Sequence, residues 1–342
     1  MSESLSKQRN ASIDMFRYLC AVLVVAIHTT PLEEISSTVS YICSSVITVI
    51  AVPFFFAVAG YFFSRKLEQG ERPLFPYLKK ILWIYLISSV PYWMIDFVRW
   101  GYSNILSFAY NSAVSFLTTG SYYHFWFFPS LLLSACITAA FFRLRLQKAL
   151  LPAAIVLYVI GCLGSSYYAV GIRIPFLQTL YDAAFFEDFR RAILTGFPMF
   201  VIGYAVHRLW QRHRARTEKN VPVLLVVCIV WWAAEMGWVH WLRLQRKVAI
   251  TPALLPLVMF VLLFLLAHPL PRYAACARKC RAMANVTYYL HPFFMMVLSK
   301  ICSVLDGSIT STIRFLIVTA TTAVLGILLN RSHNRLIRSW IG

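Results

Sequence analysis

The sequence predicts an all-α integral membrane protein, a polytopic bundle of about ten transmembrane helices with both termini in the cytoplasm. Of its 342 residues, 60 % are hydrophobic and only 13 % are charged, whereas an ordinary soluble domain carries about 25 % charged residues. The mean hydropathy is +0.68. Apolar runs recur at about 20 residues, the length that an α-helix needs to cross a bilayer. The composition therefore excludes an ordinary soluble domain and an intrinsically disordered chain.

Apolar runs of bilayer length define the expected spans and their connections. The spans lie near 13–32, 41–63, 80–98, 124–142, 150–168, 192–209, 221–242, 249–269, 283–304 and 311–330. The connections are short, apart from 99–123 and 169–191. No repeat with a period of about 20–50 residues runs along the chain, as a solenoid or propeller would need. Residues 1–342 are therefore expected to form a single membrane domain.

The net charge of +19 would also fit a nucleic-acid-binding protein, but in a membrane chain the side on which the charges lie matters more. When the N-terminus is placed inside, most Lys and Arg residues fall in the inner segments. These residues are Lys7, Arg9, Arg65, Lys66, Arg72, Lys79, Lys80, Arg143, Arg145, Lys148, Arg208, Arg212, Arg214, Arg216, Lys219, Arg272, Arg278, Lys279, Arg281, Arg331, Arg335 and Arg338. The outer trio Arg243, Arg246 and Lys247 goes against the trend. The distribution places both termini in the cytoplasm and predicts no nucleic-acid partner.

The first span carries two ionisable side chains on one face. Arg17 and His28 are eleven positions apart, and eleven steps of 100° return to within about 20° of the same helix face, about 16 Å further along the axis. Ionisable groups inside a span are costly and are functional candidates by default. Asp14 lies three residues before Arg17 and is placed to hold its rotamer as an i,i+3 pair. A snorkelling arginine with an interfacial histidine explains the same spacing without a function.

Two more ionisable residues interrupt later spans. His291 lies near the middle of the ninth span and is followed by Pro292, which frees a backbone carbonyl and kinks a helix where a cavity is lined. A buried histidine bonded to a neighbouring helix is the alternative. Glu235 is a lone acid inside the seventh span. It is a candidate for orienting a histidine, relaying protons or binding an acceptor amine.

Polar and aromatic residues at the span ends complete the candidate set. His124 and Trp126 lie at the outer end of the fourth span, and Arg190 begins the sixth from the outside. They are candidates for a pocket wall and for holding an acceptor carboxylate, although an aromatic belt and simple charge flanking explain them equally well. Lys79 and Lys80 are inner-face cations. The cysteines lie mostly singly in apolar runs and predict neither a metal site nor a disulfide.

Four motifs in order along the chain resemble the acyltransferase-3 family of integral membrane acyltransferases. Arg17, ten residues and His28 match the family's R-x10-H motif. The segment 52–61 (VPFFFAVAGY) is similar to its FFxxSGY, with Ala59 in place of the usual serine, so any role of that hydroxyl is absent. The segment 124–129 (HFWFFP) resembles the Trp-Phe segment of span four, and 287–292 (TYYLHP) resembles the family's YxxHP. The resemblance covers about residues 10–335.

A narrower resemblance is to the membrane domain of vancomycin-resistance membrane-bound serine racemases. It is carried by 12–17 (SIDMFR), 124–127 (HFWF), and Arg190 followed by 196–198 (GFP). Those proteins join an acyltransferase-3-like domain to a cytoplasmic racemase domain that uses pyridoxal phosphate (PLP). This chain would accordingly be a membrane domain or a stand-alone relative. We expect no PLP and no racemase activity in these residues, and a fused or associated cytoplasmic racemase as a partner.

The family resemblance implies transfer of an acyl group, acetyl first, from cytoplasmic acyl-CoA to a cell-envelope or small-molecule acceptor, in a bacterial plasma membrane. Arg17, with Lys79 or Lys80, would hold the phosphates of the donor. The pantetheine arm would run along the first span and bring the thioester to His28, the expected general base. His291 and Glu235 are the other expected catalytic residues.

Two other functions remain open at this point. The first is a carrier that moves serine or another small polar metabolite to a cytoplasmic racemase, which rests on the analogy with the racemase group. A transporter usually shows paired repeats with broken helices at matching positions, and the sequence has no such symmetry. The second is a sensor or scaffold whose fold has lost catalysis.

Overall fold

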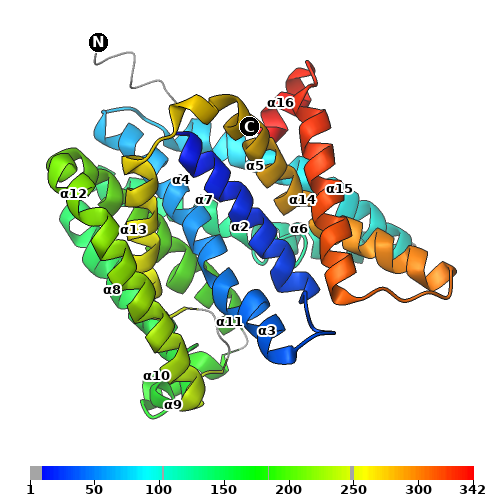
Figure 1. Ribbon diagram of the computed structural model, residues 1–342, viewed down its shortest axis with the longest axis horizontal. Coiled ribbons are helices and arrows are strands. Elements are labelled where there is room, and N and C mark those ends of the chain that lie inside the picture. The colour runs from blue at the N-terminus through cyan, green and yellow to red at the C-terminus, as the bar shows by residue number, and fades with distance from the viewer. Residues whose placement is uncertain (1–9, 102–103, 184, 247–249) are drawn as a thin grey trace. The chain divides into compact units, whose positions relative to one another are not determined.

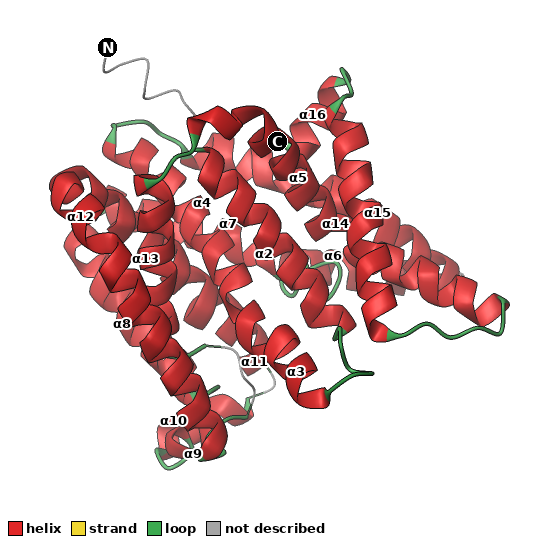
Figure 2. Cartoon of the chain, viewed as in Figure 1, coloured by secondary structure: helices red, strands yellow, loops and turns green. Residues whose placement is uncertain are grey.

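The computed structural model describes residues 10–101, 104–183, 185–246 and 250–342. Helices and loops make up these residues, without a strand among them (Figure 2). Five helical stretches are long and apolar enough to cross a membrane, or six if the bent pair Leu254–Ala267 and Pro271–Val304 counts as one. Shorter apolar helices accompany them: Ile105–Leu117, Phe127–Arg143 and Gln147–Leu163. The expectation of an all-helical polytopic protein is therefore confirmed. Lys7, Arg9 and Lys247 lie outside the described residues.

The chain packs as two compact units. One comprises Met1–Val52 with Leu262–Gly342, and the other comprises Pro53–Val261. The N-terminal and C-terminal parts of the sequence thus fold against each other. We call the first the terminal unit and the second the central unit, and describe each by itself.

In the terminal unit, α2 (Ala11–Thr29) packs against α14 (Ala274–Val304), and α15 (Ser311–Asn330) packs against both (Figure 1). In the side-chain contacts between α2 and α14, the residue numbers of both helices rise together, so the two helices are parallel. Two parallel helices in a membrane need an even number of bilayer crossings between the start of one and the start of the other. In the expected ten-span order, eight crossings lie between the start of α2 and the start of α14. The unit also contains the shorter elements α3 (Ser37–Tyr41), η1 (Ile42–Val46), η2 (Ile47–Ile50), η5 (Pro271–Tyr273) and α16 (Arg335–Ile341).

α15 runs antiparallel to α14 at close range. The Thr287 hydroxyl donates to the Thr322 hydroxyl at 3.0 Å, and both side chains are fully buried. A Cβ placed on Gly326 would lie 2.7 Å from the Cα of Met283. A small residue and an interhelical hydrogen bond are the means by which helices associate where the solvent is lipid. This pairing holds α14 in place beside α2.

Hydrogen bonds fix both ends of α2. At its start, Asn10 caps the helix by accepting from the N–H of Ile13, and its amide donates to the Leu265 carbonyl at 2.8 Å. The hydroxyl of Ser12 donates to the His268 carbonyl. Beyond its end, the carboxylate of Glu34 accepts from the Ser311 hydroxyl at 2.6 Å, at the first turn of α15. Hydrogen bonds from Ser311 and Thr312 lower the pKa of Glu34 to about 2.

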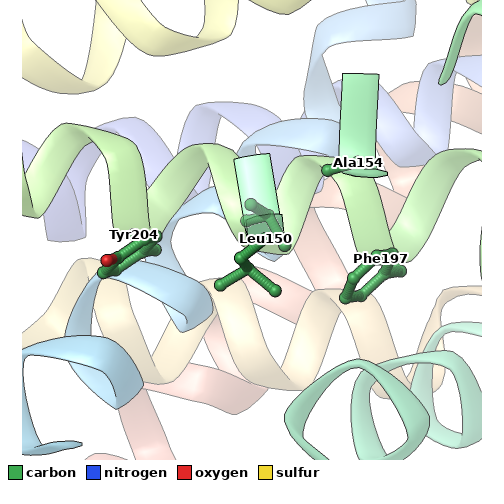
Figure 3. Close-up of a cluster of buried hydrophobic side chains, with 5 residues drawn as sticks. Leu150, Ala154, Phe197 and Tyr204 are labelled. Atoms are coloured by element: carbon green, nitrogen blue, oxygen red, sulfur yellow. The ribbon is translucent and has the colours of Figure 1, made fainter. Parts of the chain in front are cut away.

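The central unit holds the remaining helices. These are α4 (Ala51–Glu68, from Pro53 on), α5 (Leu74–Asp96), η3 (Phe97–Gly101), α6 (Ile105–Leu117), α7 (Phe127–Arg143), α8 (Gln147–Leu163), α9 (Tyr168–Gly171), α10 (Pro175–Asp182), α11 (Phe186–Phe189), η4 (Arg190–Gly196), α12 (Phe197–Trp241) and α13 (Leu254–Ala267, up to Val261). Part of its core lies between α8 and α12, where Leu150 and Ala154 meet Phe197 and Tyr204 (Figure 3).

The longest helix joins two expected spans. α12 covers both 192–209, from residue 197 on, and 221–242, and it is interrupted only at His213, where the backbone angles (φ −135°, ψ 34°) are not helical. The basic segment between the two apolar runs, which was predicted as a connection, therefore contains a kink at which two helices meet. This is one reason why the count of long apolar helices is lower than the number of expected spans.

The two long connections expected at 99–123 and 169–191 are largely helical. The first contains α6, capped at its start by Asn104, whose side chain accepts from the N–H of Ser107. The second contains α9, α10 and α11. These helices were not predicted because runs of 4–13 residues are too short to cross a bilayer.

α4 and α12 touch backbone to backbone in the central unit. A Cβ on Gly60 would overlap the carbonyl of Phe200, and a Cβ on Gly203 would overlap the carbonyl of Ala57. Each glycine thus sits opposite the main chain of the other helix. Gly60 belongs to the segment 52–61 that carries the family resemblance, and its place there follows from this close approach.

Gly60→Ala is expected to destabilise the protein, because the obstructing atoms are backbone and cannot move aside. Overpacked sites typically lose about 1–3 kcal/mol, and we expect the upper end of that range. The matched control is Gly237→Ala, since no atom lies within 4 Å of a Cβ at that helical position. Thermal unfolding of the detergent-solubilised variants measures both. An unchanged unfolding midpoint for Gly60→Ala would show that α4 and α12 are not packed this closely.

Candidate functional site

The polar cluster around Arg17 lies at the N-terminal end of the parallel pair α2 and α14. One Nη of Arg17 lies 3.7 Å from a carboxylate oxygen of Asp14, so the i,i+3 contact expected from the spacing is present. The other Nη donates to the Asn285 side-chain oxygen at 3.3 Å. Arg281 lies 3.2 Å from the second oxygen of Asp14. Two guanidinium groups therefore share one carboxylate.

The last helix adds acceptors to this cluster. Asn285 donates to the carbonyl of Ile341 at 2.8 Å, and Arg281 donates to that of Gly342 at 3.1 Å. The ring of Trp340 lies 5.5 Å from that of Tyr289. α16 is therefore docked at the same end of the helix pair as the first described residues, so residues 10 and 342 lie at one end of the terminal unit.

His28 and His291 meet toward the other end of the same two helices. Their rings stack with centroids 5.3 Å apart and an interplanar angle of 20°. His291 is fully buried and His28 is partly buried. Arg17 and His28 are eleven positions apart on α2, which corresponds to about 16 Å along the axis. The structure thus brings together two residues that the sequence analysis placed in different spans and selected separately.

Pro292 determines how His291 is held. Proline has no N–H, so the carbonyl of Tyr288, four residues before it, loses its usual helical donor. The Nδ1 atom of His291 lies 3.1 Å from that carbonyl and 3.0 Å from the carbonyl of Thr287. Carbonyls only accept, so Nδ1 carries the hydrogen and Nε2 of the neutral ring keeps its lone pair. The carbonyl expected to be freed is thus used by the histidine itself, and α14 stays helical across Pro292.

Glu235 lies in the central unit, where it is buried and has two partners. One carboxylate oxygen accepts from the Tyr167 hydroxyl at 2.7 Å, and the other accepts from the N–H of Ala253 at 2.8 Å. These two hydrogen bonds fit an acid with a structural role as well as one with a functional role. Its expected role stays a prediction.

The other candidates of the central unit differ in environment. His124 is buried in a cluster of aromatic rings, with its centroid 3.9 Å from that of Phe125 and 5.4 Å from that of Tyr92. Trp126 lies 5.9 Å from Phe56. Arg190 is buried and donates to Glu187 at 3.0 Å, so one of its hydrogen-bonding edges is already occupied. Lys79 and Lys80 are both exposed on α5.

An open pocket of about 430 Å³, lined by polar and apolar residues, lies in the central unit and was not anticipated. One wall is a stripe on α6 and its cap, formed by Asn104, Ser107, Asn111, Ser112 and Ser115. Trp93 and Asp96 of α5 face it. The opposite face of α6 is apolar and exposed, with Leu106 79 % accessible. α6 thus has a polar face at the pocket and an apolar face on the opposite side, and none of its residues is buried.

The pocket residues of α6 and the residues Arg281 and Asn285 of α14 were not predicted as site residues. Ser107, Asn111 and Ser115 recur every four residues, and this signal was available, but the segment 99–123 was treated as a connection. Arg281 was counted only as one of the inner-face charges, and Asn285 was not selected. Their spacing of four residues places them on one face of a helix, yet only the packing of α14 on α2 shows that this face meets Arg17. The described residues contain no group of three or more His, Cys, Asp or Glu placed to hold a metal ion.

Together these features define a helical membrane protein with a cation cluster and a histidine pair on one pair of helices. Residues 10–331 match the model of the acyltransferase domain family, and the chain belongs to this acyltransferase-3 family. The resemblance drawn from the four motifs is therefore confirmed.

Bacterial racemases are similar to this chain along much of its length. An amino-acid racemase of Enterococcus faecalis is 27 % identical over 94 % of this chain and 46 % of its own length. A serine/alanine racemase of Enterococcus gallinarum is 26 % identical over 91 % of this chain and 45 % of its own length. A second amino-acid racemase of E. faecalis is 30 % identical over 64 % of this chain and 31 % of its own length. The chain thus spans less than half the length of these curated relatives. No solved structure matches it.

Pro292→Ala is expected to loosen the control of His291. The new N–H at position 292 donates to the Tyr288 carbonyl and competes with Nδ1–H of the ring, so the ring samples its other tautomer. Nitrogen NMR of histidine-labelled protein measures the tautomer, and His291→Gln assigns the signal by removing it. An unchanged signal in Pro292→Ala would mean that the Thr287 carbonyl alone determines the tautomer.

Proposed function

We propose that this protein is a membrane acyltransferase that moves an acyl group, acetyl first, from cytoplasmic acyl-CoA to a cell-envelope or small-molecule acceptor. The observation that carries the proposal is that α2 and α14 together hold arginines at one end and a stacked histidine pair toward the other. Membership of the acyltransferase-3 family supports the reaction class. The proposal includes ten spans, both termini in the cytoplasm of a bacterial cell, and a cytoplasmic racemase domain as a partner.

The distance between the two ends suits the donor. Acyl-CoA has an anionic nucleotide head and a long uncharged pantetheine arm, and about 16 Å along α2 is a plausible length for that arm. Arg17 retains 26 % side-chain exposure, so it is accessible to a phosphate from the aqueous side. Guanidinium groups bind phosphate oxygens in a bidentate manner. Lys79 and Lys80 add exposed positive charge that attracts an anionic donor over longer distances.

His28 acts as the general base in this proposal. It takes the proton from an acceptor hydroxyl or amine while the acceptor atom forms a bond to the thioester carbon; the carbon–sulfur bond then breaks, and the CoA thiolate leaves with a proton returned by the imidazolium. His291 packs against the ring that gains the charge. Two imidazolium rings 5.3 Å apart would repel by about 3 kcal/mol at an effective dielectric constant of about 20. At most one of the two rings is therefore a positively charged imidazolium at a time.

The expected acceptor-binding residues of the central unit stay predictions, each considered within that unit alone. His124 and Trp126 form part of an aromatic wall, and Arg190 offers a cation for an acceptor carboxylate. Glu235 is proposed to relay a proton through the Tyr167 hydroxyl. The hydroxyl and amide groups of the α6 pocket offer further hydrogen-bond partners for a polar acceptor. Ala59 has no hydroxyl, so the serine of the family motif plays no part here.

Arg17→Ala is expected to weaken binding of acetyl-CoA to the purified protein by at least tenfold, because the phosphate-binding cation is lost. Isothermal titration in neutral detergent measures the dissociation constant. Arg212→Ala is the matched control, since Arg212 is an exposed arginine of α12, and its affinity should stay within twofold of the wild type. Equal effects of the two substitutions would reduce the role of Arg17 to general surface charge.

His28→Ala is expected to retain acetyl-CoA binding but to lower transfer by about 10²–10⁴-fold, the usual contribution of a general base. Transfer of labelled acetyl groups from acetyl-CoA to the envelope fraction of bacterial membranes containing the protein measures this. His333→Ala, at an exposed histidine, is the control and should transfer at the wild-type rate. Unchanged transfer by His28→Ala would remove His28 as the base.

A carrier of serine is the second candidate, favoured by the similarity to a serine/alanine racemase. Proteoliposomes distinguish it from the acyltransferase. If the wild type shows no measurable acetyl-CoA binding and labelled serine accumulates inside the vesicles, the carrier replaces the acyltransferase as the function of this chain.

A further inference from the structure

Arg281 is a buried arginine that shares its carboxylate partner with a second arginine. Its side chain is 9 % exposed, and the carboxylate that it contacts, Asp14, is shared with Arg17. Two guanidinium groups thus face one carboxylate at the N-terminal end of α2 and α14. Removing a charge from water is costly unless it is paired and hydrogen-bonded. The cluster therefore favours an additional anion.

A donor of Arg281 is also unused. One of its Nη atoms contacts Asp14 and the other donates to the Gly342 carbonyl, but Nε is buried and has no hydrogen-bond partner among the described residues. Buried donors nearly always have partners, and each exception requires an explanation. A phosphate that replaced one of the two Nη partners would meet that Nη–H together with the unused Nε–H, and this pair of donors is the fork that matches two phosphate oxygens.

The spacing of the two arginines indicates the form of the anion. Arg17 and Arg281 lie within 3.7 Å and 3.2 Å of the two oxygens of one carboxylate. Their guanidinium groups are therefore close enough to contact two linked phosphoryl groups at the same time. Asn285, which bonds Arg17 from α14, holds that side chain at the cluster. A single isolated phosphate would leave one of the two arginines with Asp14 alone.

We propose that Arg281 is a second phosphate-binding residue, which forms with Arg17 a clamp for a diphosphate group. This inference rests on the proposed function for the identity of the ligand, the diphosphate of acyl-CoA. Asp14 holds the two guanidinium groups in position while the clamp is empty and competes with the diphosphate when it binds. Arg281 is thus a residue for donor affinity, whereas the histidine pair performs the chemistry.

The test uses the full chain in neutral detergent, titrated with pyrophosphate and with acetyl-CoA. Arg281→Gln is expected to weaken binding of both probes by at least tenfold. Arg281→Lys keeps the charge but loses the fork and should lie between. Arg278→Gln is the matched control, because Arg278 is an exposed arginine of the same helix, and should bind within twofold of the wild type. Wild-type affinity for pyrophosphate in a folded Arg281→Gln variant overturns the proposal.

Asp14→Asn separates a clamp from a purely structural ion pair. In the clamp, removal of the competing carboxylate tightens pyrophosphate binding several-fold, because both guanidinium groups lose their internal anion. In a structural ion pair it lowers the unfolding temperature and tightens nothing, which contradicts the proposal. If Arg281→Gln alone fails to fold, the double variant Asp14→Asn with Arg281→Gln keeps Arg17 without leaving a buried unpaired carboxylate. It should still bind pyrophosphate at least tenfold more weakly than Asp14→Asn.

Two further outcomes separate this inference from the proposed function. If the wild type binds pyrophosphate through Arg17 and Arg281 but does not bind acetyl-CoA, the clamp stands and the acyl-CoA assignment fails. If acetyl-CoA binds and Arg281→Gln leaves its affinity unchanged, the donor assignment stands and the clamp fails.

Phosphatidylglycerol added to the micelles tests a lipid headgroup as the source of the phosphate. Displacement of pyrophosphate by the lipid at equal concentration would overturn the assignment to a soluble donor.

Discussion

The parallel packing of α2 on α14 is the constraint on which the terminal unit depends. α2 begins at residue 11 and α14 at residue 274, so the two helices come from opposite parts of the sequence. Polar contacts hold them at the N-terminal end, where Asp14 bridges two arginines. Aromatic contact between His28 and His291 holds them toward the other end. α15 supports α14 through a threonine pair and a close approach at Gly326.

This packing explains why ionisable side chains, which are energetically costly to expose to lipid, lie between α2 and α14. In lipid, helices gain little from hydrophobic association, and small residues and hydrogen bonds take over that role. In the terminal unit, Asp14, Arg17, Arg281 and the two histidines lie between α2 and α14, and each has a neighbour from the other helix. The arrangement also separates the arginines from the histidines by about 16 Å along one axis.

In the His-Pro pair, the missing N–H of the proline leaves a backbone carbonyl that the neighbouring histidine side chain contacts. A proline inside a helix costs a hydrogen bond, and the carbonyl it leaves on Tyr288 is one that the preceding histidine uses. The histidine thereby has a defined tautomer, with the hydrogen on Nδ1 and the lone pair on Nε2. Gly60 is a similar case, because its missing side chain is what allows α4 to approach the backbone of α12.

Composition, span periodicity and the order of four motifs were enough to predict a helical membrane protein, its family and the Arg17–His28 stripe, because these depend on the chemistry of one helix at a time. The Asp14–Arg17 contact could be predicted for the same reason. Local patterns do not show which helices pack together, so Arg281, Asn285 and the stacking of His28 on His291 required the tertiary structure. The helix α6 and its pocket were missed because α6 is shorter than the bilayer thickness used to define a span, and only packing shows which residues line the pocket.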